Sequence, residues 1–448
     1  MDSTALIATA LLALVLAALS LTLRRHVRLY ILAFVAIPQF YLPGVPVPLA
    51  QAYALFLLVA SFFDTDLRIR KRAITVPIGI VATLTLVALI FPPHPGSAMS
   101  ILVYYGTWVC ILRYIWAERS SPRHLNIAIA STIPWIVLEA VLTVSFRLRP
   151  SLENAFLHSP VAELLIGPAA PSLFSGEPNN VLDPAKAGGL FVNGNVASMF
   201  LGVACLTIAV LARRLRSRLL GVLSIATLAA VFATGSKTGA VLAILIPIVA
   251  WVIVRVSRGS RRVFILPALL AVVGASIAAP AAISTLFPSF TAQGDVSLGT
   301  RGGLWGLAGR LFVDHPFAGV GWDEFQEYAL RLTGSAFPPH NLIIAAWANT
   351  GILGGITVVG FIVGCVVGGL VAAFRATDQR QRRIIVYALC GSGWVFIHGM
   401  ADNTSIYGEP KTMVLLSLLL ALSLPAAARL GTDRVSAPAE VVSAVQAK

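Results

Sequence analysis

Three residues in the second half of the chain combine reactive or charged side chains with unusual surroundings. The first, His340, stands directly before a hydrophobic run in PPHNLIIAAWANTGILGG, and Asn341 after it is placed to cap or orient a helix. Histidine titrates near neutral pH, so a neutral imidazole at this boundary could take the proton from a hydroxyl group. The plainer interpretation is a histidine that only covers the end of a helix.

The other two residues, Arg301 and Lys237, are cations that could bind an anion. Arg301 lies in SLGTRGGLWGLAGRLF, where we expect Thr300 to cap a short helix with apolar residues at helical spacing from Leu304 to Phe312. A helix start repels cations, so an arginine there suggests an anion held jointly by Arg301 and the free N–H groups. Lys237 opens another hydrophobic run in ATGSKTGAVLAIL. The plainer interpretations are a solvated loop arginine and a lysine whose ammonium group reaches out to water.

Seven further polar or aromatic residues near the starts and ends of hydrophobic runs are candidate substrate-binding residues. They are Lys186, Asn193, Asn195, Trp305, Asn341, His398 and Asp402. The asparagines could donate hydrogen bonds to ligand hydroxyl groups, and capping of the following helix explains them equally well. Polar residues at membrane depth are costly and often functional, although His398 and Asp402 are also consistent with a place at the interface.

The composition identifies the class of protein that must position these residues. Of 448 residues, 57% are hydrophobic and 12% are charged, whereas soluble domains carry roughly 25% charged residues. The chain is therefore predicted to be an all-α polytopic membrane protein. The net charge of +14 could suggest a nucleic-acid partner, but the distribution of the basic residues argues for membrane topology instead. The cysteines all lie in apolar runs, which favours packing over disulfides or metal binding.

The hydrophobic runs predict 12 or 13 transmembrane helices. They cover 4–23, 29–42, 49–63, 74–91, 98–117, 125–146, 196–212, 219–234, 238–254, 263–286, 341–374, 384–400 and 411–430. Prolines in the 29–63 region could instead make a re-entrant hairpin, and the 341–374 run is long enough to be tilted or broken at Gly351, Gly354 or Gly360. The first run lacks the basic start of a cleavable signal peptide.

The basic residues orient these helices. One alternating set of loops and span ends carries 25 of the 33 Lys and Arg residues, which places those loops in the cytoplasm by the positive-inside rule. Topology does not explain the remaining eight, which are expected on the outer side. They are Arg147, Arg149, Lys186, Lys237, Arg301, Arg310, Arg331 and Lys411.

This orientation divides the chain into six predicted regions. They are N-terminal transmembrane helices (1–146), an irregular outer loop with little helix (147–195), further transmembrane helices (196–286), a large outer loop with short helices (287–340), C-terminal transmembrane helices (341–430) and a disordered cytoplasmic tail (431–448). The outer segments contain no clustered acids of the kind that bind divalent metals, so we expect neither a metal nor another cofactor.

Several segments, taken in order, resemble the superfamily of O-antigen ligases and O-antigen polymerases. They are GLFVNGNVASMFLG, GSKTGAVLAIL, TRGGLW with the following GRLFVDHPFAGVGWDEF, PHNLIIAAWANTGILGG, and the segment from His398 to Asp402, and together they cover about 188–410. The resemblance implies a GT-C-like bacterial enzyme of the plasma membrane. Such an enzyme transfers a glycan from undecaprenyl diphosphate to a hydroxyl acceptor on the outer face. In this chain Lys237 stands where the family commonly has arginine, which retains the charge and loses bidentate recognition of phosphate.

The resemblance also implies roles for the candidate residues. His340 would be the catalytic base, and Arg301 and Lys237 would stabilise the departing diphosphate, in a metal-independent transfer with inversion. The implied partners are the lipid-linked donor, a lipid or glycan acceptor and membrane lipids, with no nucleic acid and with a monomer as the simplest state. Three alternatives stay open: a polymerase of the same superfamily, a transporter of lipid-linked glycans, and a non-enzymatic scaffold. A transporter usually needs acids within its spans, where Glu139 is the main acid here.

Overall fold

The computed structural model describes residues 15, 18–41, 47–63, 95–167, 171–174, 183, 185–257, 288–322, 324–334, 336–402 and 404–424. Apart from one isolated bridge, Ser405 to Gly408, the described residues form helices and loops without a strand. The predicted runs at 4–23, 74–91 and 263–286 lie wholly or largely outside the described residues, as does the predicted tail at 431–448. The predicted total of 12 or 13 transmembrane helices therefore stays a prediction.

The described helices include those of the predicted hydrophobic runs and four more in the predicted outer loops. They are α2 (Arg25–Val35), α3 (Leu49–Phe63), α5 (Pro95–Ala117), α6 (Pro122–Leu148), α7 (Pro150–Leu157), α8 (Pro160–Ile166), α9 (Gly194–Leu215), α10 (Arg218–Ala233), α11 (Lys237–Val256), α13 (Pro288–Asp314), α14 (Glu324–Thr333), α15 (Leu342–Arg375), α16 (Gln379–Gly399) and α17 (Met413–Ser423), with short 3-10 turns η2 (Pro171–Phe174) and η3 (Gly189–Phe191). The four helices in the predicted outer loops are α7, α8, α13 and α14. Within the described part, α5, α6, α9, α11 and α15 are long and apolar enough to cross a membrane. The chain is an all-α polytopic membrane protein.

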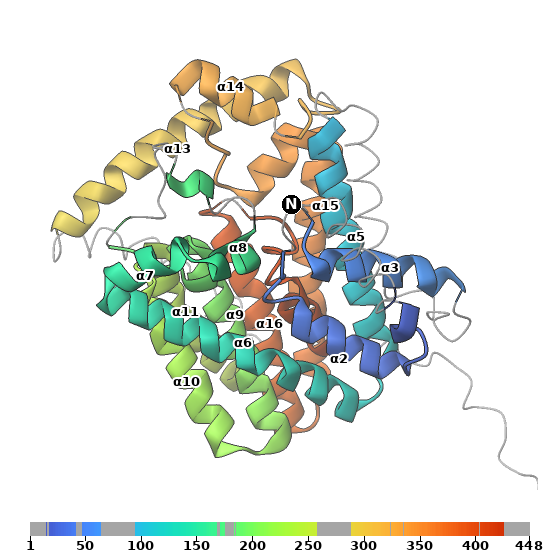
Figure 1. Ribbon diagram of the computed structural model, residues 1–448. Helices are drawn as coiled ribbons and strands as arrows, with labels where there is room; N and C mark the ends of the chain where they lie inside the picture. The colour runs from blue at the N-terminus through green and yellow to red at the C-terminus, as the bar shows by residue number, and fades with distance from the viewer. Residues whose placement is uncertain are drawn as a thin grey trace, which may run out of the picture.

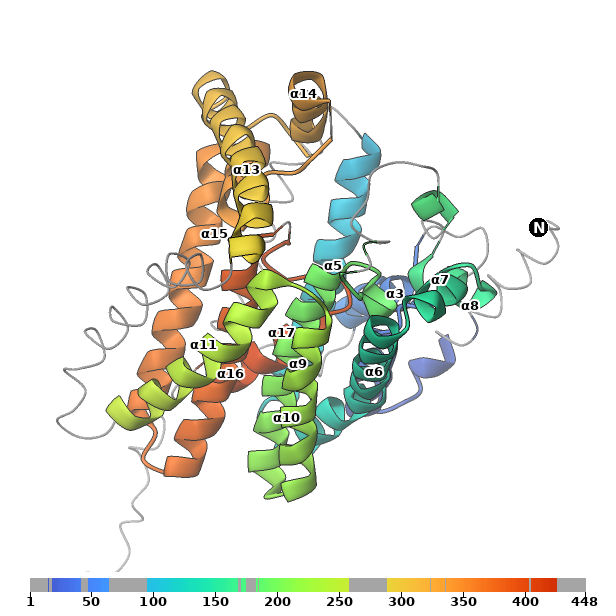
Figure 2. The same cartoon turned by 90° about the vertical axis from the view of Figure 1, so that its left-hand side faces the viewer.

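The centre of the bundle is formed by α9 and α16. Helix α9 packs against α6, α10, α11, α16 and α17, and α16 packs in turn against α11, α15 and α17 (Figures 1 and 2). Small residues allow this close packing. A Cβ at Gly202 of α9 would lie 2.0 Å from the ring of Trp394 on α16, so the indole fits because the glycine has no side chain. All four cysteines are buried and free.

Helix α15 is broken at Gly351, one of the three glycines where a break was predicted. This residue has φ 68° and ψ −165°, values outside the helical range. The loop at 315–321 fills the break. Its backbone makes three hydrogen bonds with α15, from Val320 N–H to Ala348 O (2.9 Å), from Gly321 N–H to Asn349 O (3.0 Å), and from Ile352 N–H to Pro316 O (2.8 Å). The break therefore leaves no polar backbone group unpaired at these positions, and it fixes the loop after α13 to α15.

The large outer loop contains more helix than the sequence predicted. Helix α13 begins at Pro288, so Thr300 does not cap it, and Arg301 lies inside the helix and not at its start. Proline is favoured at the first helical position, and this signal precedes Thr300, which we expected to be the cap. The helix ends at Asp314, shortly after the predicted stripe. The predicted apolar stripe packs on α14 and α15 in a small second core of Leu304, Leu307, Ala308, Leu311, Phe325, Ala329 and Ala348.

The other outer loop, 147–195, was also predicted to have little helix, and this was wrong for its first half. Helices α7 and α8 each begin with proline, and the Ser159 hydroxyl accepts a hydrogen bond from the Ala162 N–H to cap α8. Proline at the first helical position and a serine cap favour short helices even in a segment rich in loop-forming residues.

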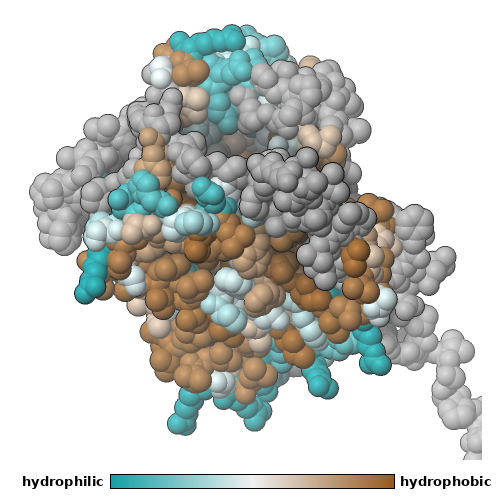
Figure 3. Space-filling view, viewed as in Figure 1, coloured by the Kyte–Doolittle hydropathy of each residue, from teal (hydrophilic) through white to brown (hydrophobic). Residues whose placement is uncertain are grey.

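The bundle has two polar ends. One end carries the arginine-rich helix termini and connections of α5, α6, α9, α10, α15 and α16, and is called the arginine end below. The other end carries α13 and α14 beside the beginning of α15 (Figure 2). Between them Figure 3 shows a broad hydrophobic surface with hydrophilic side chains projecting beyond it. This is the surface expected of a protein embedded in a bilayer.

Candidate active site at the helix ends opposite the arginine end

Four helix ends meet at the end of the bundle opposite the arginine end. They are the starts of α9, α11 and α15 and the end of α16. Glycines allow the close contacts: a Cβ at Gly239 of α11 would lie 2.5 Å from the Ser198 Cβ of α9, and one at Gly399 of α16 would lie 3.3 Å from the Leu342 Cβ of α15. Each helix start carries the positive end of a helix dipole, so three of them together favour an anion.

Asn341 fixes the start of α15. Its side-chain oxygen accepts hydrogen bonds from the N–H groups of Ile343 (3.0 Å) and Ile344 (3.1 Å), and its amide nitrogen donates to the carbonyl of Met400 at 3.1 Å. The side chain therefore caps α15 and ties it to the end of α16. The structure gives Asn341 a positioning role, and its predicted contact with substrate stays a prediction.

His340 lies on a left-handed backbone, with φ 51°. Its Nδ1 lies 3.7 Å from Oδ1 of Asp402, with 26% and 13% of the two side chains exposed. This distance is longer than a hydrogen bond, and Nδ1 has no hydrogen-bond partner among the described residues. A small closure would let Nδ1–H donate to Asp402, leaving the other ring nitrogen, Nε2, with its lone pair available as a base.

His398 occupies a fully buried position beneath this pair. Its Nε2 lies 3.2 Å from the Ser198 hydroxyl, and that hydroxyl donates to the carbonyl of Asn195 at 2.7 Å. His398 also interacts electrostatically with Asp402 and with Arg301. The predicted residues His398, Asp402, Asn195 and Arg301 are thus neighbours, although their positions in the sequence are far apart.

The start of α9 is built from the segment that contains Lys186, Asn193 and Asn195. The Asn193 side-chain oxygen accepts the Asn195 N–H at 2.8 Å, which is the capping role considered from the sequence. Lys186 lies 4.0 Å from Asp183 through its ammonium group, and its Cβ would lie 3.3 Å from a Cβ at Gly194. The backbone and Cβ of Lys186 therefore lie beside the start of α9, while its ammonium group faces Asp183.

Lys237 is the first residue of α11, and the turn before it packs on the same segment. The Thr234 carbonyl accepts the Ala187 N–H at 3.2 Å, and Ser236 caps α11 by accepting the Gly239 N–H at 3.1 Å. Through Gly239 the helix lies against Ser198. The start of α11 therefore joins the group around His398, and Lys237 is a cation at a helix start, where the dipole disfavours positive charge.

Trp305 connects α13 to the histidine segment. Its indole N–H donates to the Pro339 carbonyl at 2.8 Å, next to His340 in the sequence. The same helix carries Arg301, so one hydrogen bond links the helix of the predicted anion-binding arginine to the segment of the predicted base. Trp305 thus has an observed positioning role, while direct substrate binding by the indole stays a prediction. In contrast, Arg310 and Arg331 are exposed, and Arg331 pairs with Glu327 at 3.3 Å.

The sequence analysis did not assign a role to three charged residues that hold the segment before α9. Glu139 of α6 accepts the Leu190 N–H at 2.7 Å, and Glu153 accepts the Gly188 N–H at 3.3 Å. The Lys411 ammonium group donates to the carbonyls of Leu165 (2.8 Å) and Leu190 (2.9 Å) and interacts electrostatically with Glu139. Two features of the sequence pointed to two of these residues. Glu139 is an acid inside a predicted span, and Lys411 is an outer cation that the predicted topology does not explain.

The arrangement can bind an anion and accept a proton at neighbouring positions. Lys237 is at the start of α11, Lys186 precedes α9 and Arg301 lies within α13, while His340 Nδ1 lies 3.7 Å from Asp402. Among the described residues, no group of three or more His, Cys, Asp and Glu side chains is arranged to hold a metal ion. The fold and the site define a polytopic helical membrane protein with a polar, cationic site at one end of its bundle.

Comparison with known families identifies the class further. Residues 222–359, about a third of the chain, match the family model described as O-antigen ligase. This match supports a relationship to the O-antigen ligase superfamily, whose members are membrane glycosyltransferase-like enzymes. The matched segment includes Lys237, Arg301, His340 and Asn341 and ends before His398 and Asp402. No curated protein matches the chain.

Proposed function

We propose that the protein transfers a glycan from a polyprenyl diphosphate, of the undecaprenyl type, to a hydroxyl acceptor at the outer face of the bacterial plasma membrane. The observation that carries the proposal is the pairing of His340 with Asp402 at the start of α15, within a group of cations that come from separate helices. The arginine end faces the cytoplasm under the positive-inside rule, which supports the outward orientation of this site.

In the proposed reaction the acceptor oxygen forms a bond to the anomeric carbon while the bond from that carbon to the diphosphate oxygen breaks. His340 Nε2 takes the hydroxyl proton, and the diphosphate leaves with the electron pair. Arg301 and Lys237 stabilise the charge that develops on the leaving group, in the manner of preorganised charge stabilisation. A single displacement of this kind inverts the anomeric configuration. Asp402 keeps the imidazole oriented and stabilises the imidazolium that forms.

The full-length protein, purified and incubated with a polyprenyl diphosphate oligosaccharide, tests this function. Two acceptors are compared: a lipid A–core glycolipid, which a ligase would use, and a second lipid-linked glycan, which a polymerase of the same superfamily would use. Mass spectrometry of the products reports transfer to either acceptor, and NMR of the new glycosidic linkage reports its configuration. We expect transfer with and without EDTA, and a strict metal requirement would contradict the proposed role of the cations.

The variant His340→Asn tests the base. Asparagine tolerates the left-handed backbone found at this position, so the fold should be retained. Loss of a general base should reduce the transfer rate about 100- to 10,000-fold. The matched control is His315→Asn, because His315 is exposed at the end of α13. Equal transfer by both variants would overturn the mechanism, and transfer by neither the wild type nor the control would overturn the function.

A further inference from the structure

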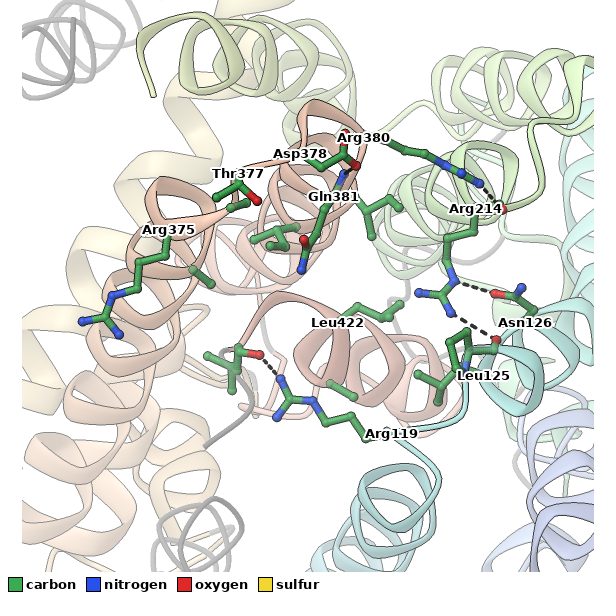
Figure 4. Close-up of a pocket in the computed structure, with 17 residues that line it drawn as sticks. Arg119, Leu125, Asn126, Arg214, Arg375, Thr377, Asp378, Arg380, Gln381 and Leu422 are labelled. Atoms are coloured by element: carbon green, nitrogen blue, oxygen red, sulfur yellow. Dashed lines mark hydrogen bonds between the residues drawn. The ribbon is translucent and has the colours of Figure 1, made fainter. Parts of the chain in front are cut away.

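A second polar hollow lies at the arginine end of the bundle, far from the candidate active site along the same helices. Its volume is about 620 Å³, and it lies where α5, α9, α15 and α17 end and where α6 and α16 begin (Figure 4). No residue of the proposed reaction lines it. The hollow therefore needs an explanation independent of glycan transfer.

The charge of this hollow is strongly positive. Its described lining includes four arginines, Arg119, Arg214, Arg375 and Arg380, against one acid, Asp378. Figure 4 shows the four guanidinium groups spaced around it. The acid is committed elsewhere, because its carboxylate accepts the Gln381 N–H at 3.0 Å and caps α16. Three cations in excess remain around a single concave surface.

Hydrogen bonds to neutral groups hold the arginines in place. Arg214 donates to the Asn126 side chain at 2.5 Å and to the Pro122 carbonyl at 3.1 Å, which ties α9 to α6. Arg380 donates to the carbonyls of Arg213 (2.9 Å) and Arg214 (2.5 Å) at the end of α9. Arg119 donates to the Leu424 carbonyl. The bonds of Arg214 and Arg380 are to neutral groups, so they fix these two guanidinium groups and leave their charge available to an anion.

A second basic hollow at the same end differs in this respect. It contains Arg24, Arg25, Arg28 and His124 together with Glu118. There, Glu118 lies 2.5 Å from both Arg25 Nε and His124 Nδ1, and these contacts lower the pKa of the Glu118 carboxyl against the effect of burial. The positive-inside rule alone accounts for arginines at this end. It does not explain why the two hollows differ. In the second hollow the described basic residues are grouped around the Glu118 carboxylate, whereas those of the first hollow are not grouped around a carboxylate.

The rest of the lining is apolar. Its hydrophobic residues are Leu125, Ala372, Ala376, Ile384, Ile385, Ala421, Leu422 and Leu424. An anion that was fully hydrophilic would leave this surface in contact with water. A ligand with a charged group beside hydrocarbon would cover both parts of the hollow.

We propose that this hollow binds the head group and upper acyl chains of an anionic phospholipid from the cytoplasmic leaflet. The arginines would hold the phosphate, and the apolar wall would contact the glycerol and the first methylenes of the chains. Basic pockets between transmembrane helices at this side of a membrane suit such head groups. The chain's own C-terminal segment at 425–448 is a poor alternative, because it has three basic residues against two acids and no acidic excess.

Native mass spectrometry of the full-length protein in detergent tests the site. The probes are dioleoyl phosphatidylglycerol and dioleoyl phosphatidylcholine, which share acyl chains and differ in net charge, with inorganic phosphate as the soluble competitor. We expect the anionic lipid to be retained in preference to the zwitterionic lipid, and phosphate to leave it bound. Displacement by inorganic phosphate would indicate a site for a free anion, and equal retention of the two lipids would indicate no head-group recognition. Either result overturns the proposal.

Matched variants locate the binding in this hollow. Thr377 lines it and is exposed, so Thr377→Glu adds a negative charge while Thr377→Gln adds the same bulk without charge. We expect Thr377→Glu and Arg375→Gln each to weaken binding of the anionic lipid about fivefold, the effect of one charge near a lipid head group. Thr377→Gln and Arg218→Gln, an exposed arginine of the same end that does not line the hollow, should leave it unchanged. Unchanged binding in Thr377→Glu would overturn the assignment, whatever the transfer assay shows.

Discussion

The two ends of the bundle differ in where their cations lie on the helices. At the arginine end Arg213 and Arg214 lie in the last turn of α9 and Arg375 in the last turn of α15, where the negative end of the helix dipole favours cations. At the other end Lys237 is the first residue of α11, and Lys186 lies beside the start of α9, where the dipole disfavours cations. The arginine end also has cations at helix starts, Arg218 of α10 and Arg380 of α16, so the last-turn arginines are what sets the two ends apart.

The acids differ between the ends as well. At the arginine end Asp378 accepts backbone N–H bonds at the start of α16, and these bonds lower the pKa of its carboxyl. At the other end burial and the neighbouring Asp402 raise the pKa of the Glu409 carboxyl to about 8. The Asp378 carboxyl therefore stays ionised at neutral pH, whereas the pKa of the Glu409 carboxyl lies close to neutral pH.

The largest expected effect is a difference in glycan transfer between an arginine variant at the candidate site and arginine variants elsewhere. We expect Arg301→Gln to reduce glycan transfer by about 100-fold or more, by analogy with the loss of one preorganised charge-stabilising group. The matched control is Arg310→Gln, on the same helix and exposed, and Arg375→Gln serves as the control from the arginine end. Both controls should keep transfer within about twofold, since neither residue lies in the candidate active site. A comparable loss in the controls would mean that net charge, and not the site, determines the rate.

The break in α15 should show a large effect on stability. Gly351 has positive φ, and a Cβ there would lie 2.2 Å from the Phe317 carbonyl oxygen, so Gly351→Ala should lower stability by at least about 1–2 kcal/mol. Gly360→Ala is the control on the same helix, because a Cβ at Gly360 meets open space and alanine favours helix. Thermal unfolding in detergent measures both. A stable Gly351→Ala protein would show that the loop at 315–321 does not depend on the break.

These glycines also show what could be predicted from the sequence. Hydrophobic length and the distribution of arginines were sufficient for the all-α membrane fold, and Gly351 was among the predicted break points. The contact that explains the break was not predictable, because it joins Gly351 to a loop whose backbone position depends on tertiary packing. The start of α13 was misplaced for a local reason, since Thr300 after Gly299 looked like a cap while Pro288 began the helix earlier.

In the candidate site, too, some residues could be predicted from the sequence and others could not. His340, Arg301 and Lys237 could be selected by residue type and by their positions beside hydrophobic runs. The contacts of their neighbours could not. Ser198, Met400 and Pro339 contact His398, Asn341 and Trp305 through a hydroxyl or a backbone carbonyl that no sequence pattern marks. Lys411 was visible as an unexplained cation, but its two carbonyl acceptors come from separate outer segments.

A smaller effect should come from the link between α13 and the histidine segment. Trp305→Phe keeps an aromatic ring and removes the N–H that donates to the Pro339 carbonyl. Loss of one hydrogen bond costs about 1 kcal/mol, so we expect transfer to fall by about fivefold with little change in thermal stability. Trp251→Phe is the control, because Trp251 is exposed on α11, away from the helix starts. A loss as large as that in Arg301→Gln would indicate that the indole contacts substrate directly.

The smallest effect concerns the protonation of Glu409. Its carboxyl pKa is about 8 in the folded protein, against an ordinary value of 4.5, so the folded state binds a proton that the unfolded state has released between these values. This contribution to stability is fully present below about pH 4.5 and is lost as pH rises through about 8. Glu409→Gln does not titrate, so its melting temperature should match that of the wild type near pH 5 and exceed it increasingly up to about pH 9. The control Glu327→Gln removes an exposed carboxylate paired with Arg331 and should show no such growing difference. A difference in melting temperature that stays constant across this pH range would show that Glu409 is ionised throughout. The carboxyls of Glu409 and Asp378 would then not differ in protonation.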